Sequence, residues 1–261
     1  MSAATTIDWC EDNYAVTVYV AEFWNTVTAA STLLPAAVWF MLPQPDGAGL
    51  APSMYLLMIV IQTGSVLFHG TLTFAGQLMD EVPILIFCVA SLSMLFDNAC
   101  IRAPEGVAKP CDAVRRISWA PGPQLLLVSS TVQTASIVYV YVAQKKLYAV
   151  FIVSVVFQAL LHWPILVYEM RGRLNWDPAI LKMMALHLGF GYGGYLLWCM
   201  DNAFCQQLGW LHLHAWWHIF AILGMKAWVD ILIYHRLFVM GLRPKYRHRW
   251  AGFGACISCD A

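Results

Sequence analysis

The chain has 261 residues and no net charge at pH 7; 60% of its residues are hydrophobic and only 11% are charged. A soluble domain carries roughly 25% charged residues, so this composition, with a mean hydropathy of +0.63, excludes an ordinary soluble protein. The balanced charge gives no indication of nucleic-acid binding, and the length fits one helical bundle over residues 1–261.

Hydrophobic runs of about 20 residues, the length that crosses a bilayer, divide the chain into seven segments. We predict helices over 20–42, 53–75, 80–98, 123–143, 147–169, 179–201 and 212–241. Turn-forming or polar stretches separate them, including 43–47 and the Pro-rich loop 98–123. The predicted fold class is an all-α membrane protein, a seven-transmembrane helix bundle.

The basic residues predict the orientation of this bundle. With seven spans, one face carries only Lys145 and Lys146, whereas the face of the C-terminus carries ten basic residues: Arg102, Lys109, Arg115, Arg116, Arg171, Arg173, Arg243, Lys245, Arg247 and Arg249. Cytoplasmic loops are enriched in Lys and Arg, so we expect segment 1–19 to be lumenal or extracellular and the tail 242–261 to be cytosolic. An endoplasmic reticulum or Golgi membrane is the expected location, although the sequence leaves the plasma membrane open.

Three histidines are predicted to meet on the N-terminal face. His214 and His218 are four residues apart at the start of the last helix, so they share a helical face and can both reach one metal ion. His69 ends the second span, at the same face of the membrane. Three His ligands with an open fourth position are typical of a catalytic zinc site. The alternative for the pair alone is an aromatic interface.

Ser65 and Asp80 are candidate catalytic residues beside these histidines. Ser65 lies one helical turn before His69 and shares its face, where its hydroxyl can stabilise an oxyanion. Asp80 opens the third predicted helix on the same side and can activate a water molecule. The structural alternatives are a serine bonded to its own helix and an aspartate that caps a helix.

The segment 8–13 is dense in oxygen donors, and Glu22 follows at the start of the first predicted helix. Carboxylates, an amide and backbone carbonyls are ligands that calcium prefers. The spacing is not that of an EF-hand and by itself is a weak indication, and the alternative is a solvated acidic turn. Glu22, Asp80 and Asp201 all lie at helix ends, where an ionisable residue near bilayer depth is a functional candidate.

The cysteines and the remaining histidines carry weaker indications. Cys10 and Cys205 both fall in predicted lumenal segments, where a disulfide can persist, whereas Cys100 and Cys111 are expected to stay reduced on the cytosolic face. Core or interface roles are expected for five histidines: His162, His187, His212, His235 and His248.

Six blocks of the sequence, in order along nearly the whole chain, together resemble the alkaline ceramidase family of integral membrane amidases. These blocks are Asp8-Trp9-Cys10-Glu11-Asp12-Asn13-Tyr14, Ala21-Glu22-Phe23-Trp24-Asn25-Thr26, Gly64-Ser65 with Phe68-His69, Gln77-Leu78-Met79-Asp80-Glu81, Asp201-Asn202 with Cys205, and His214-Ala215-Trp216-Trp217-His218. The family shares a superfamily with the progestin and adipoQ receptors.

The resemblance implies a role for each matching residue. His69, His214 and His218 would bind zinc, Asp80 would activate water, and Ser65 would support the ligands or the oxyanion. A structural or regulatory calcium ion would be held by Asp8, the Trp9 carbonyl, Glu11, Asn13 and Glu22, and a disulfide would join Cys10 to Cys205.

The predicted function is zinc-dependent hydrolysis of the amide bond of ceramides, with dihydroceramide and phytoceramide left open as substrates. The substrate would enter from the bilayer, with membrane lipids as neighbours and no protein partner expected. The main alternative is a seven-helix receptor or ligand-binding protein of the progestin/adipoQ type with structural zinc. A transporter using Lys226, Asp230 and Asp201 ranks last, because no chain of polar residues crosses all depths.

Overall fold

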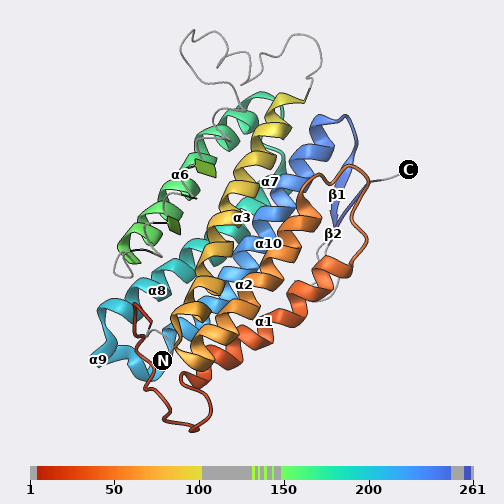
Figure 1. The fold of residues 1–261 in the computed structure, drawn as a ribbon. Coiled ribbons are helices and arrows are strands. Elements are labelled where there is room, and N and C mark those ends of the chain that lie inside the picture. The colour runs from red at the N-terminus through yellow and green to blue at the C-terminus, as the bar shows by residue number, and fades with distance from the viewer. Residues whose placement is uncertain are drawn as a thin grey trace. The chain divides into compact units, whose positions relative to one another are not determined.

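The computed structural model describes residues 5–101, six positions between 131 and 143, residues 148–247, and residues 256–259. Within these residues the regular secondary structure is helical, apart from one short two-stranded ribbon (Figure 1). The regular elements are α1 (Phe23–Met41), α2 (Ala51–Thr71), α3 (Phe74–Cys100), α6 (Tyr148–Gly172), α7 (Pro178–His187), α8 (Gly193–Ala203), α9 (Cys205–Leu208), α10 (Leu213–Val239), β1 (Pro244–Arg247) and β2 (Cys256–Cys259).

Four of these helices are long and apolar enough to cross a membrane, judged by length and composition: Ala51–Thr71, Phe74–Cys100, Phe151–Gly172 and Leu213–Val239. The predicted helical fold class is confirmed at this level, and the helix predicted over 123–143 falls mostly outside the described residues. The ribbon in the tail was not predicted. Its strands β1 and β2 pair antiparallel, with Pro244 opposite Cys259.

The helix predicted over 179–201 is interrupted. α7 ends at His187, a π-helical turn covers Leu188–Tyr192, and α8 begins at Gly193. A Cβ atom on Gly224 of α10 would lie 2.7 Å from the backbone nitrogen of Gly191, so the glycine-rich turn passes unusually close to α10. The missing side chains allow this close approach.

The chain forms two compact units. The first comprises residues 1–42, 55–84 and 184–228, and the second comprises 43–54, 85–183 and 229–261. The long helices α2, α3 and α10 each contribute to both units. All the predicted site residues belong to the first unit.

Two glycines bring α2 and α3 together within the first unit. A Cβ on Gly64 would lie 2.1 Å from the Met79 carbonyl oxygen, and a Cβ on Gly76 would lie 2.9 Å from the Phe68 Cα. The backbones therefore touch at two levels, each beside a predicted site residue. Ser65 and His69 follow Gly64 and Phe68 directly on α2.

The second unit contains a buried polar network. Glu169 forms ion pairs with Arg173 and, at 3.0 Å, with His235. Arg173 also donates to the carbonyl oxygen of Asn98, at 3.0 Å, which ties the end of α6 to the end of α3. Cys100, at the end of α3, is disulfide-bonded, so the expectation of a free thiol there is wrong; Cys111 lies outside the described residues.

Candidate metal centre

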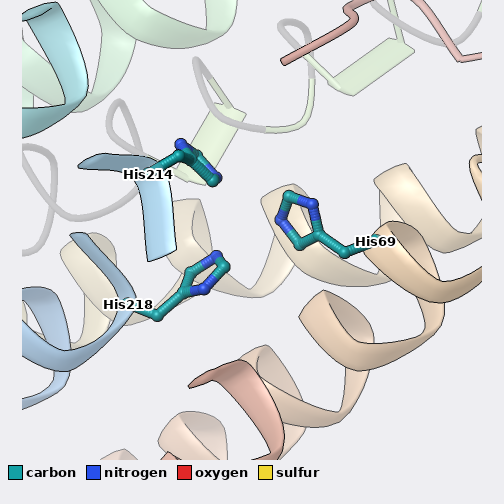
Figure 2. Close-up of side chains that lie close together, drawn as sticks. All are labelled: His69, His214 and His218. Carbon is teal, nitrogen blue, oxygen red and sulfur yellow. The ribbon is translucent and has the colours of Figure 1, made fainter. Parts of the chain in front are cut away.

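His69, His214 and His218 come together inside the first unit (Figure 2). One ring nitrogen of each histidine lies within 4.8 Å of those of the other two, and all three side chains are buried. The ring centroids are 4.8 to 5.0 Å apart. Zinc bonds to histidine nitrogen at about 2.0–2.1 Å, so a modest contraction of this triangle would accommodate one ion.

Glu22 orients the His69 ring. Nδ1 of His69 hydrogen-bonds to Oε2 of Glu22, and the Glu22 backbone N–H donates to the His69 carbonyl oxygen at 3.0 Å. Because a carboxylate can only accept, Nδ1 carries the proton and Nε2 is the nitrogen left for a metal. Nε2 is buried and makes no hydrogen bond within the described structure. Such a carboxylate–histidine pair is typical of a metal ligand.

Thr28 fixes the tautomer of His218. The Thr28 hydroxyl donates to the carbonyl oxygen of Trp24 at 2.8 Å, and its oxygen lies 3.0 Å from Nδ1 of His218. One hydroxyl has one proton, so His218 donates from Nδ1 and leaves Nε2 unprotonated. Nε2 then lies 3.3 Å from the Ser65 hydroxyl, which donates to it. The expected proximity of Ser65 to the histidines is therefore present in the structure.

His214 is held by stacking and by its backbone. Its ring stacks on Trp9 at a centroid distance of 3.7 Å, and its backbone N–H donates to Oδ1 of Asp201 at 3.3 Å. Nδ1 of His214 is buried and has no hydrogen-bond partner among the described residues. Two of the three ligand candidates thus present a bare buried nitrogen, which is costly without a partner and fits a site built for a cation.

Asp80 lies on α3 next to the close contact with α2. A Cβ on Gly64 would come within 2.6 Å of the Asp80 backbone nitrogen, so this residue lies against the helix that carries Ser65 and His69. Its side chain makes no hydrogen bond to the three histidines within the described residues. Asp80 lies inside α3, not at its start, so the alternative of an N-terminal helix cap does not apply.

The acidic N-terminal segment packs against the start of α1. Both carboxylate oxygens of Glu11 accept backbone N–H groups, from Trp24 at 2.6 Å and from Asn25 at 2.9 Å. Glu11 therefore caps this helix, a role that spacing did not reveal. Burial raises the pKa of Glu11 above its ordinary value, and the nearby Glu22 carboxylate raises it further, against the lowering effect of the two N–H donors.

Several of the candidate calcium ligands interact with one another. The Asn13 amide donates to Oδ1 of Asp8 at 3.1 Å, and the Trp9 backbone N–H donates to the Glu22 carboxylate. Electrostatic repulsion links Glu22 to both Glu11 and Asp8. A divalent cation would relieve that repulsion, so the donor set fits calcium in its chemistry.

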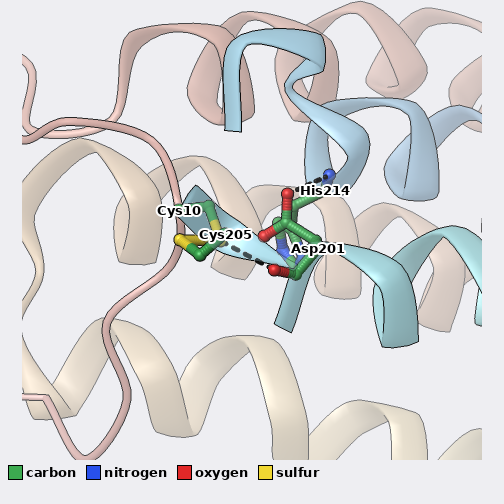
Figure 3. Close-up of a disulfide and its surroundings, with 4 residues drawn as sticks. All are labelled: Cys10, Asp201, Cys205 and His214. Atoms are coloured by element: carbon green, nitrogen blue, oxygen red, sulfur yellow. Dashed lines mark hydrogen bonds between the residues drawn. A yellow bond between two sulfur atoms is a disulfide. The ribbon is translucent and has the colours of Figure 1, made fainter. Parts of the chain in front are cut away.

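A disulfide joins Cys10 to Cys205, as the sequence resemblance implied (Figure 3). The Cys10 sulfur lies 2.7 Å from the carbonyl oxygen of Asp201, the residue whose side chain accepts from the His214 backbone. A disulfide sulfur has no proton to donate, so this is a close contact. The N-terminal segment is thereby fastened beside the residues that hold His214.

Three of the other five histidines make hydrogen bonds or ion pairs outside the metal centre. Ser91 lies 2.7 Å from Nε2 of His162, His187 donates to the Gly224 carbonyl oxygen at 2.9 Å, and His235 pairs with Glu169. These contacts support the expected core roles. His212 stands just before α10 in a left-handed conformation with φ of 48°, and His248 lies outside the described residues.

Sequence reasoning missed three contributions to this centre: the Thr28 hydroxyl, the Trp9 ring and the Glu22–His69 pair. One signal was available for the first. Asn25, Thr28 and Thr32 recur at helical spacing within a mostly apolar segment, which indicates a polar face turned inward. Nothing in the spacing indicates which tryptophan covers a histidine.

Comparison with known proteins identifies the family of this chain. A family model described as Ceramidase matches residues 2–257. Alkaline ceramidase 3 of Mus musculus is 29% identical over 264 residues, covering 93% of this chain and 88% of that protein. Alkaline ceramidase YPC1 of Saccharomyces cerevisiae is 26% identical over 277 residues, covering 94% and 81% respectively. The resemblance inferred from the six sequence blocks is confirmed, and the chain belongs to the Ceramidase family of hydrolases.

Proposed function

We propose that this protein hydrolyses the amide bond of ceramides to a sphingoid base and a free fatty acid, with a zinc ion held by His69, His214 and His218. The observation that carries this proposal is the buried triangle of imidazoles, two of which present bare nitrogens. Family membership and the names of the relatives support the substrate class.

The ligand set fits zinc in its chemistry. Three neutral imidazoles are typical of catalytic zinc, which keeps a fourth position for water or substrate. When bound, the ion would supply a Lewis acid for attack on the amide carbonyl. Glu22 and Thr28 would keep the Nδ1 protons of His69 and His218 in place, so that both Nε2 atoms remain available.

Asp80 would transfer protons, and Ser65 would stabilise the developing negative charge. Asp80 would accept a proton from the attacking water and transfer it to the amine as the carbon–nitrogen bond breaks. The Ser65 hydroxyl, which donates to His218 in this structure, would donate to the amide oxygen as that oxygen gains negative charge. Trp9 would shield the centre from bulk water through its stacking on His214.

A seven-span topology with a lumenal or extracellular N-terminus accompanies this proposal. Four helices long enough to cross a membrane and the asymmetric distribution of Lys and Arg support it. The lipid substrate would then reach the centre from the bilayer, in an endoplasmic reticulum or Golgi membrane. The disulfide agrees with an oxidising compartment on the side of the metal centre.

Calcium at Asp8, the Trp9 carbonyl, Glu11, Asn13 and Glu22 is the second metal of the proposal. Its role would be structural or regulatory, because Glu22 also contacts His69. Neutralising the repulsion around Glu22 would steady the carboxylate that orients a zinc ligand.

The test is hydrolysis by the purified protein in lipid vesicles of a panel of ceramide, dihydroceramide and phytoceramide. Release of free fatty acid should stop when zinc is removed with a chelator and return when zinc is added. His218→Ala should abolish turnover and zinc binding. His162→Gln is the matched control, because His162 is a buried histidine outside the centre and its replacement should retain both. Zinc binding by the wild type without any fatty acid release would favour the receptor reading instead.

A further inference from the structure

We propose that residues 14–20, named here the apolar loop, form a membrane-contact element that lies at the boundary between lipid headgroups and acyl chains. The proposal requires a membrane-embedded chain but depends neither on zinc nor on ceramide hydrolysis. The partner it names is the lipid surface.

The apolar loop turns large uncharged side chains outward. Its sequence, Tyr-Ala-Val-Thr-Val-Tyr-Val, contains no charged residue. Four side chains are strongly exposed: Tyr14 at 49%, Val16 at 54%, Val18 at 77% and Tyr19 at 88%. Single exposed apolar residues are ordinary in proteins, whereas a contiguous group of them marks an interaction site.

Backbone hydrogen bonds hold this loop in a defined shape. The Tyr14 N–H donates to the Ala21 carbonyl oxygen at 2.6 Å, which closes the loop across its base. The Tyr19 N–H donates to the Thr17 hydroxyl at 3.3 Å. Tyr14 itself has a positive φ of 60°, which a tyrosine adopts only when its surroundings require it. The outward side chains are thus a consequence of an ordered turn.

The exposed face of α1 indicates which partner contacts the apolar loop. Exposed apolar side chains recur along this helix at intervals of one or two turns: Trp24 at 44%, Val27 at 42%, Leu34 at 70%, Val38 at 38% and Met41 at 71%. The opposite face, with Asn25, Ala29, Thr32, Ala36 and Trp39, is buried. In a membrane-embedded chain the exposed apolar face lies against acyl chains.

The apolar loop extends the lipid-facing surface of α1 beyond the start of that helix. It leads directly into α1 and is the red segment that precedes that helix in Figure 1. Tyrosine is enriched where acyl chains give way to headgroups, because its ring is apolar and its hydroxyl is polar. The acidic residues Asp8 and Asp12 come just before the loop, so the chain passes from a polar segment to an apolar one over a few residues, as an interface requires.

The base of the loop is attached to the metal centre. The Ala21 N–H donates to the Gly70 carbonyl oxygen at 3.1 Å, and the next residue, Glu22, donates to His69 at 3.0 Å. Contact between the loop and lipid would therefore fix the depth of the Glu22–His69 pair in the membrane. A lipid substrate would meet the protein at that same depth.

Site-specific photocrosslinking tests this proposal. The photoreactive residue p-benzoylphenylalanine is introduced at Tyr19 in the apolar loop, at Leu34 on the exposed face of α1, and at the exposed Asp12 as the matched polar control. Each full-length variant is placed in phosphatidylcholine vesicles whose lipids carry a clickable acyl chain, and it is irradiated after its folding has been confirmed by gel filtration. Lipid adducts are then quantified by mass spectrometry.

We expect the Tyr19 variant to form as much lipid adduct as the Leu34 variant, and several-fold more than the Asp12 variant. Labelling at Tyr19 no stronger than at Asp12 would place the loop in water and overturn the proposal. A crosslink from Tyr19 to a second polypeptide would overturn it as well, because the surface would then be a protein interface. Neither result depends on catalytic activity, so the proposed hydrolysis is tested separately.

Discussion

Glu22 and His69 are bonded twice, once between the carboxylate and Nδ1 and once between the Glu22 N–H and the His69 carbonyl oxygen. The two residues are 47 positions apart, one just before α1 and the other near the end of α2. The backbone bond sets the position of the carboxylate, and the carboxylate sets the orientation of the imidazole. The imidazole of His69 is therefore oriented by a residue that lies outside its own helix.

Replacement of Glu22 by Gln should weaken zinc binding about 10- to 100-fold, the usual effect of losing the carboxylate behind a metal-bound histidine. Gln keeps the size of the side chain but loses the negative charge that stabilises the Nδ1 proton. The measurement is zinc affinity by competition with a fluorescent chelator. Asp12→Asn, which neutralises an exposed carboxylate in the same region, is the control. Unchanged affinity in Glu22→Gln would show that the pair does not orient a metal ligand.

Thr28→Val should lower activity and zinc affinity together, because valine has the shape of threonine but cannot accept the His218 Nδ1 proton. The backbone of Asn25 remains as a partner of His218, so the loss is one hydrogen bond, about 0.5–1.5 kcal/mol, which corresponds to roughly 2- to 13-fold in affinity. Thr63→Val is the matched control, since Thr63 bonds only to Ile59 of its own helix and is exposed. Equal behaviour of the two variants would argue against the assigned tautomer.

Glu11→Gln should lower the thermal stability of the protein even without calcium. Trp24 and Asn25 donate to different carboxylate oxygens of Glu11, and glutamine replaces one of these oxygens with an NH2 group that cannot accept, so the start of α1 loses part of its cap. Loss of a cap costs about 0.5–2 kcal/mol. Melting temperatures of the variant and the wild type are compared with and without added calcium. If the difference appeared only with calcium, Glu11 would act as a metal ligand and its capping role would be minor.

Gly64→Ala should strongly destabilise the protein, because the added methyl group would lie 2.1 Å from the Met79 carbonyl oxygen, where the backbones of α2 and α3 touch. Gly172→Ala is the matched control, since no atom lies within 4 Å of its added methyl group. Alanine in a helix is favoured over glycine by about 0.5–1 kcal/mol, so the control should be neutral or slightly stabilising. Circular dichroism melting of both variants measures the contrast. A Gly64→Ala protein as stable as the control would contradict the close packing.

The sequence predicted the features of the site that follow from periodicity and composition, including the convergence of the three histidines. The i, i+4 spacing of His214 and His218 placed them on one face, and the positions of the apolar runs brought His69 to the same end of the first unit. It could not predict partners that depend on tertiary packing. Glu11 was a calcium candidate by composition, but its capping of α1 follows only from how the N-terminal segment folds back.

The predicted helix boundaries were wrong where small residues allow an irregular backbone. The segment 179–201 is apolar throughout, so hydropathy predicts one continuous helix, but its glycines permit a π-helical turn beside Gly224. Likewise, the third helix was predicted to begin at Asp80, whereas it begins at Phe74. The earlier start moves Asp80 from the end of a helix to its interior and removes its capping role.

The histidine triangle joins parts of the chain that are synthesised far apart in time. Ser65 and His218 are separated by 153 positions, and the disulfide closes over 195. A nascent chain that has not yet inserted α10 therefore holds one imidazole of the three, although Cys205 lies before α10 and can already pair with Cys10. Completion of the last helix is thus the step that brings the three imidazoles together, whereas the disulfide needs only the chain up to Cys205.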